Sequence, residues 1–194
     1  GALECGRSPA EWVGKTKEWA GKAAEIDRSM LLPMGSTIYA YIMQAQYEQD
    51  GGQDISATLN LATTLVDEAS RRYGEHGVLA QHSAILRYLG SRQQSLQGKD
   101  PTPAIDSALM AVRRCQGLSR EVDATCTAIA AQLYVQQAEW AHGQHVATAE
   151  WEGRAGTQAL SALRAAGGDN DVRLSVAEVF WRLARLRRAK GVDV

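Results

Sequence analysis

Apolar and polar residues alternate along this chain with the period of an α-helix, and short glycine-containing turns interrupt the pattern. Pairs such as Ile38 and Ile42 stand four positions apart, as the apolar stripe of a packed helix requires. The two-residue alternation of a half-buried β-strand is absent from the sequence. The pattern therefore predicts an all-α chain. Its helices are expected at 8–28, 36–50, 54–74, 78–97, 101–116, 120–142, 146–166 and 171–190.

A short turn recurs five times at nearly constant spacing. Its glycines are Gly6, Gly52, Gly98, Gly143 and Gly191. They are separated by 46, 46, 45 and 48 residues. A fixed period of this length is typical of solenoids, in which each unit buries its apolar face only by stacking on its neighbours. We expect residues 1–194 to form a single right-handed α-solenoid of stacked antiparallel helix pairs, with about eight helices.

The residues after each glycine suit the start of a helix. Two positions later stand Ser8, Asp54, Asp100, His145 and Asp193. Four of these five are good N-cap residues, and Pro9 and Pro101 suit the first helical turn. Each glycine is therefore expected to end one helix just before the next begins. Because the pattern starts within one unit and stops as another should begin, we expect the chain to be part of a longer array.

These turns resemble those of a known repeat family. Gly98-Lys99-Asp100-Pro101 matches a Gly-x-Asp-Pro turn followed by an alanine-rich helix, whereas Gly143-Gln144-His145-Val146 departs from it at both Asp and Pro. The chain resembles the extended variety of tetratricopeptide-like repeat found C-terminal to the catalytic domain of large bacterial serine/threonine protein kinases. The resemblance implies a docking, sensing or assembly role, and no catalysis within these residues.

The charge balance and the motifs exclude several functions. The chain carries 21 basic and 22 acidic residues, which argues against a nucleic-acid platform. No apolar run approaches the roughly 20 residues that span a bilayer, so we expect no membrane segment here. A Gly-rich phosphate loop, a nucleophile elbow and the kinase signatures are all absent, and no cofactor or metal is expected.

Two cysteines form a candidate disulfide. Cys115 and Cys126 are eleven residues apart and flank the turn Gly117-Leu118-Ser119-Arg120, so they could meet across a helical hairpin. The alternative is a pair of small buried thiols. A bridge would favour an extracytoplasmic setting.

A partner is expected to bind the concave face, which the helix before each turn should line. The candidate positions lie eleven, eight and four residues before each turn glycine, outside the predicted apolar stripe. The candidates are Tyr41, Gln44, Glu48, Arg87, Gln94, Gln132, Phe180 and Arg187. Trp140 is a further candidate anchor, because the aligned Gln49, Ser95 and Arg188 are polar.

Three functions remain open from the sequence. The first is a non-catalytic protein- or peptide-binding or sensory domain of a larger signalling protein, such as a bacterial kinase. The second is an architectural array that self-associates, for instance as a homodimer through exposed end helices. The third is an α-helical enzyme whose catalytic groups are scattered along the chain.

Overall fold

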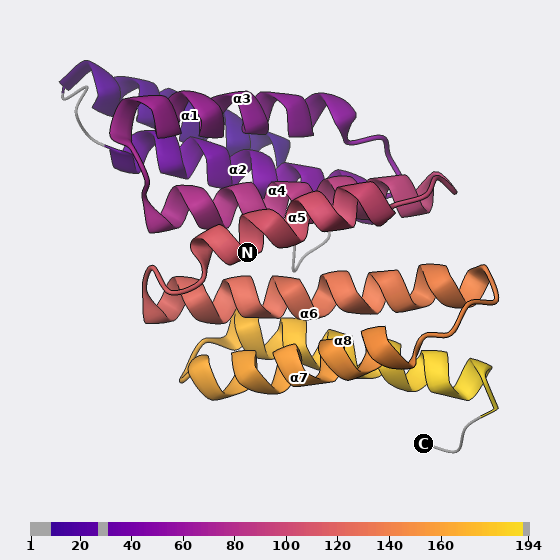
Figure 1. Cartoon of the computed structure of the whole chain (residues 1–194). Coiled ribbons are helices and arrows are strands. Elements are labelled where there is room, and N and C mark those ends of the chain that lie inside the picture. Colours follow the sequence, from indigo (N-terminus) through magenta and orange to yellow (C-terminus); the bar gives the residue numbers. More distant parts are fainter. Residues whose placement is uncertain (1–8, 27–30, 192–194) are drawn as a thin grey trace.

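A computed structural model describes residues 9–26 and 31–191, and these residues fold into eight helices with no strand (Figure 1). In chain order they are α1 (Ala10–Ile26), α2 (Leu31–Asp50), α3 (Ser56–Tyr73), α4 (Gly77–Leu96), α5 (Thr102–Cys115), α6 (Arg120–Gly143), α7 (Ala149–Ala165) and α8 (Asn170–Ala189). The all-α prediction is confirmed. Helix α2 begins five residues earlier than predicted, because Pro33 lies in its first turn, where proline sacrifices no intrahelical hydrogen bond.

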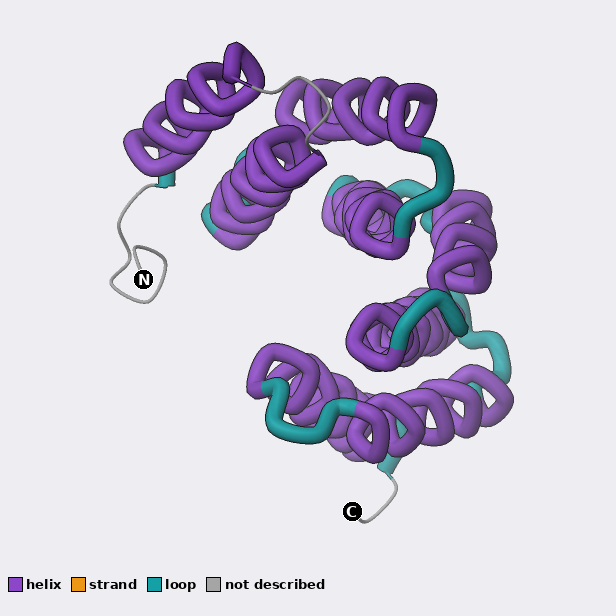
Figure 2. Tube along the Cα trace, turned by 90° about the vertical axis from the view of Figure 1, so that its left-hand side faces the viewer, coloured by secondary structure: helices purple, strands orange, loops and turns teal. Residues whose placement is uncertain are grey.

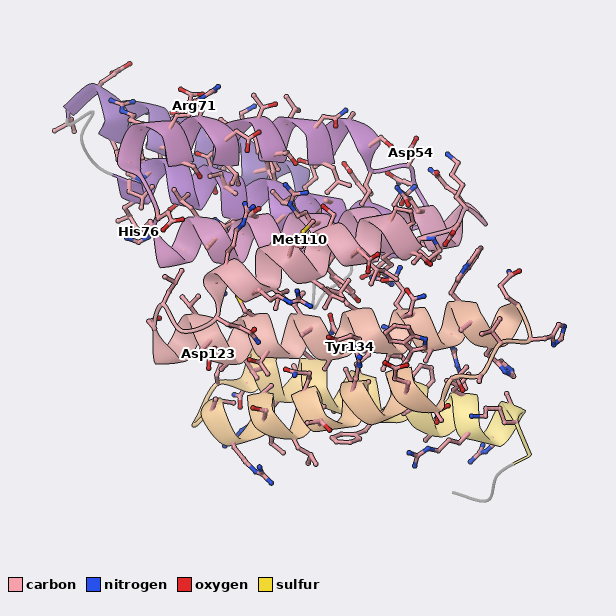
Figure 3. The ribbon with its side chains drawn as sticks, viewed as in Figure 1. Asp54, Arg71, His76, Met110, Asp123 and Tyr134 are labelled. Carbon is pink, nitrogen blue, oxygen red and sulfur yellow. A yellow bond between two sulfur atoms is a disulfide. The ribbon has the colours of Figure 1, made fainter. Side chains whose placement is uncertain are left out.

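The helices form two layers that follow one another in a curved stack. Each helix packs against the next in the chain, and α2, α4, α6 and α8 also contact one another in series. Among the described residues α1, α3, α5 and α7 make no such contacts with each other, so they form the outer layer. Arg71 on α3 and Met110 on α5 are both exposed on this layer (Figure 3). Figure 2 shows the stack bending into an arc that is open on one side.

The core follows the boundary between the two layers. Ile38, Ile42 and Ala45 of α2 are fully buried, at the spacing predicted for the apolar stripe. One buried cluster extends from α1 to α6, and a second joins α6 to α7 and α8. Alanines of α7, such as Ala155 and Ala159, are inaccessible to solvent and allow close packing within the second cluster. Helix α6 contributes to both clusters and therefore links the two halves of the stack.

Aspartates bond to the first residues of two helices, but the N-cap residues are Ile55 and Pro101, each one residue after the predicted Asp54 and Asp100. The Asp54 carboxylate accepts hydrogen bonds from the backbone N–H and the hydroxyl of Ser56, at 2.9 and 2.6 Å. Asp100 accepts the backbone N–H of Thr102 at 2.9 Å. Hydrogen bonds to these neighbours hold the pKa of both carboxyl groups below the usual range, so both remain charged at neutral pH.

The turn at Gly143 differs from the prediction. Gly52, Gly98 and Gly191 adopt positive φ angles of 73, 69 and 73°, but the equivalent residue of the turn at Gly143 is His145, at 58°. Gly143 is instead the last residue of α6. The left-handed positions are thus separated by 46, 47 and 46 residues, which is more regular than the glycine spacing. The predicted turn residues Gly6, Ser8 and Asp193 lie outside the described residues.

Cys115 at the end of α5 and Cys126 in α6 form a disulfide. Their Cα atoms are 6.4 Å apart, and both residues are completely buried. Beside the bridge, the Asp123 carboxylate accepts the backbone N–H of Gly117 at 3.2 Å (Figure 3). The bridge therefore closes the α5–α6 hairpin next to a hydrogen-bonded turn.

Replacing both Cys115 and Cys126 by alanine is expected to lower the free energy of unfolding by about 2.5 kcal/mol. The closed loop is eleven residues long, and opening it returns loop-closure entropy to the unfolded chain. Urea denaturation of the natural chain and the double variant measures the difference. Reduction of the natural chain should cause a similar loss, and equal midpoints for its oxidised and reduced forms would contradict the prediction.

Candidate peptide-binding groove

The concave side of the stack contains a cavity of about 650 Å³. Side chains from all four inner helices line it, together with Asp169 just before α8. Its aromatic and sulfur-containing lining residues are Tyr39, Met43, Tyr47 and Tyr88. Its amide-bearing lining residues are Gln46, Gln81 and Gln132. We refer to this cavity as the concave groove. Apolar surface combined with a few hydrogen-bonding groups is typical of ligand sites in proteins.

One position of the repeat lines the groove in every unit. Thirteen residues before the left-handed residue of each turn stand Tyr39, Ile85, Gln132 and Glu178. All four line the groove. The last two are also joined directly, because Gln132 Nε2 donates to Glu178 Oε2 at 3.4 Å. The groove is therefore built by the repeat itself, one side chain per unit.

Of the nine predicted partner-binding residues, only Gln132 lies in the concave groove. The predicted positions were eleven, eight and four residues before each glycine. A residue eleven before the turn lies two residues after the groove position, which rotates it by about 200° around the helix. Gln132 is the exception because the left-handed residue of that turn is His145, two residues later than Gly143. The predicted residues other than Gln132 therefore lie on other faces of the inner helices than the groove position.

Several of the other predicted residues contact outer helices. Arg87 donates to the Ser107 hydroxyl of α5 at 2.7 Å. Glu48 accepts from Thr58 of α3 at 2.7 Å and from Gln44 at 2.6 Å. These contacts join α4 to α5 and α2 to α3, and they leave the side chains outside the groove.

The remaining predicted residues have different surroundings. Tyr41 is buried, and the Lys17 ammonium lies 5.2 Å from its ring centroid. Arg187 lies 3.4 Å from the Glu152 carboxylate of α7, and Phe180 is exposed on α8. Gln94 and Trp140 are half-buried.

Trp140 occupies a different repeat position from the one predicted, because the left-handed residue of its turn is His145. Counted from His145, its equivalents are Tyr47, Gln93 and Leu186 rather than Gln49, Ser95 and Arg188.

Buried amides connect the inner helices beneath the groove, and the sequence patterns did not reveal them. Gln49 Nε2 of α2 donates to the Leu89 carbonyl of α4 at 3.0 Å. The Ser91 hydroxyl of α4 donates to Gln136 Oε1 of α6 at 3.0 Å, and Gln136 Nε2 donates to Ser95 Oγ at 2.8 Å. Gln49 Oε1 is buried without a hydrogen-bond partner among the described residues. Buried hydrogen bonds between side chains fix the register of neighbouring elements. They hold α2, α4 and α6 in a defined spacing.

The charged side chains of the groove are mainly acidic. Its lining contains four carboxylates, on Asp50, Asp169, Asp171 and Glu178, but one guanidinium, on Arg92. Arg92 lies 3.0 Å from Asp50, and Asp169 accepts backbone N–H groups at the start of α8. Burial and the nearby Asp171 carboxylate raise the pKa of Tyr39. The negative charge is therefore concentrated where α8 faces α2.

Among the described residues, no group of three or more His, Cys, Asp or Glu side chains could hold a metal ion. Within the same part of the chain, no helix is long and apolar enough to cross a membrane. Comparison of the chain with protein-family models, curated proteins and solved structures gives no match.

Proposed function

We propose that this chain is a non-catalytic binding domain that holds an extended segment of a partner protein in the concave groove. The observation that carries this proposal is the repeated groove position, which places one side chain per unit along a continuous cavity. An extended peptide can meet such a row one residue after another, and concave surfaces of solenoids favour this use. The groove amides offer both donors and acceptors to a peptide backbone.

The charge of the groove favours a segment that carries lysine or arginine. Four carboxylates face one guanidinium, and the Asp171 side chain is exposed. Electrostatic complementarity of this kind raises association rates and selects against acidic partners. The affinity is therefore expected to fall as salt concentration rises.

The Gly-x-Asp-Pro turn at Gly98 supports placing the domain in a larger signalling protein, such as a bacterial serine/threonine kinase. There it would act as a docking or sensory region. The buried disulfide favours an oxidising compartment for this segment.

A library of short peptides of varied net charge tests the groove. We expect the peptides that bind to be basic. We expect Asp171→Lys to lower their affinity by about tenfold, through like-charge repulsion in the groove. Asp106→Lys is the matched control, because Asp106 is an exposed aspartate near the start of the outer helix α5. Affinity measured by fluorescence anisotropy at two salt concentrations gives the result. The absence of any binding peptide, or equal losses in both variants, would contradict the proposal.

A second candidate function is self-association, which the end helices favour. Fourteen and ten residues before the turn, α2 carries the buried Ile38 and Ile42, but α8 carries the exposed Ala177 and Trp181. Trp181 is 60% exposed. Among the described residues, no neighbour covers this face of α8 as one covers its counterpart in α2.

The opposite end of the stack has a matching exposed face. Trp12 and Trp19 of α1 are 60% and 67% exposed. Thr58, which stands 46 residues after Trp12, is buried and donates to Glu48 of the preceding inner helix. An inner helix such as α8 of a second copy therefore fits against α1, in a head-to-tail contact.

Trp181→Glu is expected to prevent this association by placing a charge in the apolar contact. The average mass of the natural chain, measured by sedimentation equilibrium, should rise with concentration, whereas the variant should stay monomeric. Leu160→Glu is the control, since Leu160 is exposed on the outer helix α7. A natural chain that remains monomeric at every concentration would contradict self-association.

A further inference from the structure

An aromatic ring and a carboxylate lie close together in the concave groove. Tyr39 of α2 and Asp171 of α8 both line the groove, so they come from the first and the last inner helix of the stack. Both are accessible, since Tyr39 is 45% exposed and Asp171 is also exposed. Burial and the charge of Asp171 raise the pKa of Tyr39, which places the carboxylate on the same side of the groove as the phenol.

The other three carboxylates of the groove already have partners. Asp50 lies 3.0 Å from Arg92. Asp169 accepts two backbone N–H groups at the start of α8. Glu178 lies 3.8 Å from a guanidinium of its own helix. Asp171 is therefore the groove carboxylate best placed to receive a cation from a bound peptide.

The Tyr39 ring separates the concave groove from a second cavity, of about 670 Å³, at the α1 end of the molecule. His82 of α4 lines the second cavity but not the groove, and its ring is stacked on Tyr39 with the centroids 6.3 Å apart. His82 therefore packs on the tyrosine from the side of the second cavity. The side of the ring that lines the groove is available to a ligand.

The chain itself contains a guanidinium held between a tyrosine ring and a carboxylate. Arg154 of α7 lies 2.6 Å from the Glu150 carboxylate, and its guanidinium carbon is 5.7 Å from the centroid of the Tyr134 ring. A planar guanidinium can stack on an aromatic face and donate from its edge to a carboxylate at the same time. A lysine ammonium has no plane to stack and no fork of donors. A ring beside a carboxylate therefore favours arginine over lysine.

We propose that Tyr39 and Asp171 form a subsite for an arginine side chain of the bound peptide, with the guanidinium stacked on the ring and paired with the carboxylate. This inference rests on the proposed peptide-binding function and narrows it from a basic segment to one that carries arginine. The bound arginine would contact α2 and α8 together, and so connect the two ends of the arc.

Two fluorescein-labelled peptides of equal length and charge test the subsite, one of alternating alanine and arginine and the other of alternating alanine and lysine. We expect the natural chain to bind the arginine peptide about fivefold more tightly, as one cation–π contact allows. Fluorescence anisotropy measures both affinities. Equal affinities would overturn the arginine subsite but leave the peptide function standing. Failure of both peptides to bind would overturn the two proposals together.

Variants of one residue locate the preference. Tyr39→Leu removes the ring, so the two peptides should bind it equally, whereas Tyr39→Phe keeps the ring and should keep the preference. Tyr73→Leu is the matched control, because Tyr73 ends the outer helix α3 and lies outside the groove. A preference that survives in Tyr39→Leu would overturn the proposal.

A spectroscopic measurement on the natural chain decides the question even if Tyr39→Leu fails to fold. In the chain with ¹³C-labelled tyrosine, the arginine peptide should shift the ring resonances of Tyr39 and leave those of Tyr73 in place. Unchanged Tyr39 resonances at saturating arginine peptide would overturn the proposal.

Discussion

Glu139→Gln is expected to lower the free energy of unfolding by about 3 kcal/mol. The side chain of Arg182 on α8 is only 12% exposed, and it makes a two-pronged contact with Glu139 of α6, at 2.6 and 3.1 Å. The next carboxylate, on Glu178, is 3.8 Å away. Removing one partner of a buried pair leaves an uncompensated charge, which costs about 3–5 kcal/mol. The lower end applies because the Glu139 side chain is 28% exposed.

Urea denaturation measures this loss, and Glu150→Gln provides the matched control. Glu150 pairs with Arg154 one turn later on α7, and both side chains are at least half exposed. Exposed pairs of this kind contribute less than about 1 kcal/mol. A double variant, Glu139→Gln with Arg182→Met, should regain most of the lost stability, since no charge is then left buried. Equal costs for Glu139→Gln and Glu150→Gln would show that the pair does not hold α8 to α6.

The helices could be predicted from the sequence because their signals are local. The predicted helix at 78–97 corresponds to α4 at Gly77–Leu96, and 171–190 corresponds to α8 at Asn170–Ala189. An apolar stripe and a turn residue each act within a few positions of the chain. The candidate disulfide was accessible for the same reason, because Cys115 and Cys126 flank a single turn.

The register of the third repeat was not predictable from the glycines. Glycine is common where helices end, because it adopts positive φ most readily, so the repeat was counted from Gly143. His145 adopts it instead, as histidine does more often than most residues. A shift of two residues rotates a helix by about 200°, so it moves every predicted face in that unit.

The groove position and the buried amides beneath it depend on contacts between distant parts of the chain. Ser91 and Gln136 are 45 residues apart in the sequence. Both side chains are buried, and they are hydrogen-bonded to each other. Ser91 stands at the repeat position that Ala45 occupies, seven residues before the turn glycine. Ala45 is also fully buried. Burial at one position therefore did not require an apolar residue, and only the packed structure distinguishes the core from the groove.

Acidification is expected to destabilise the natural chain by about 3 kcal/mol through His82 alone. Burial lowers the pKa of this histidine from 6.5 to about 4 in the folded state. Between these two pH values the unfolded chain binds a proton that the folded chain does not bind, so protons favour unfolding. The contribution is fully present above pH 6.5 and is lost as pH falls through this window, at about 1.4 kcal/mol per pKa unit.

The difference between the natural chain and His82→Phe isolates this effect. Every other titratable group is present in both proteins, so its contribution cancels when their unfolding free energies are subtracted at each pH. At neutral pH, His82→Phe should be at least as stable as the natural chain, since it buries no unpartnered nitrogen. At pH values near 4 the variant should retain about 3 kcal/mol that the natural chain has lost. Parallel pH profiles would mean that His82 takes up protons equally well in both states. That result would place the ring in contact with solvent.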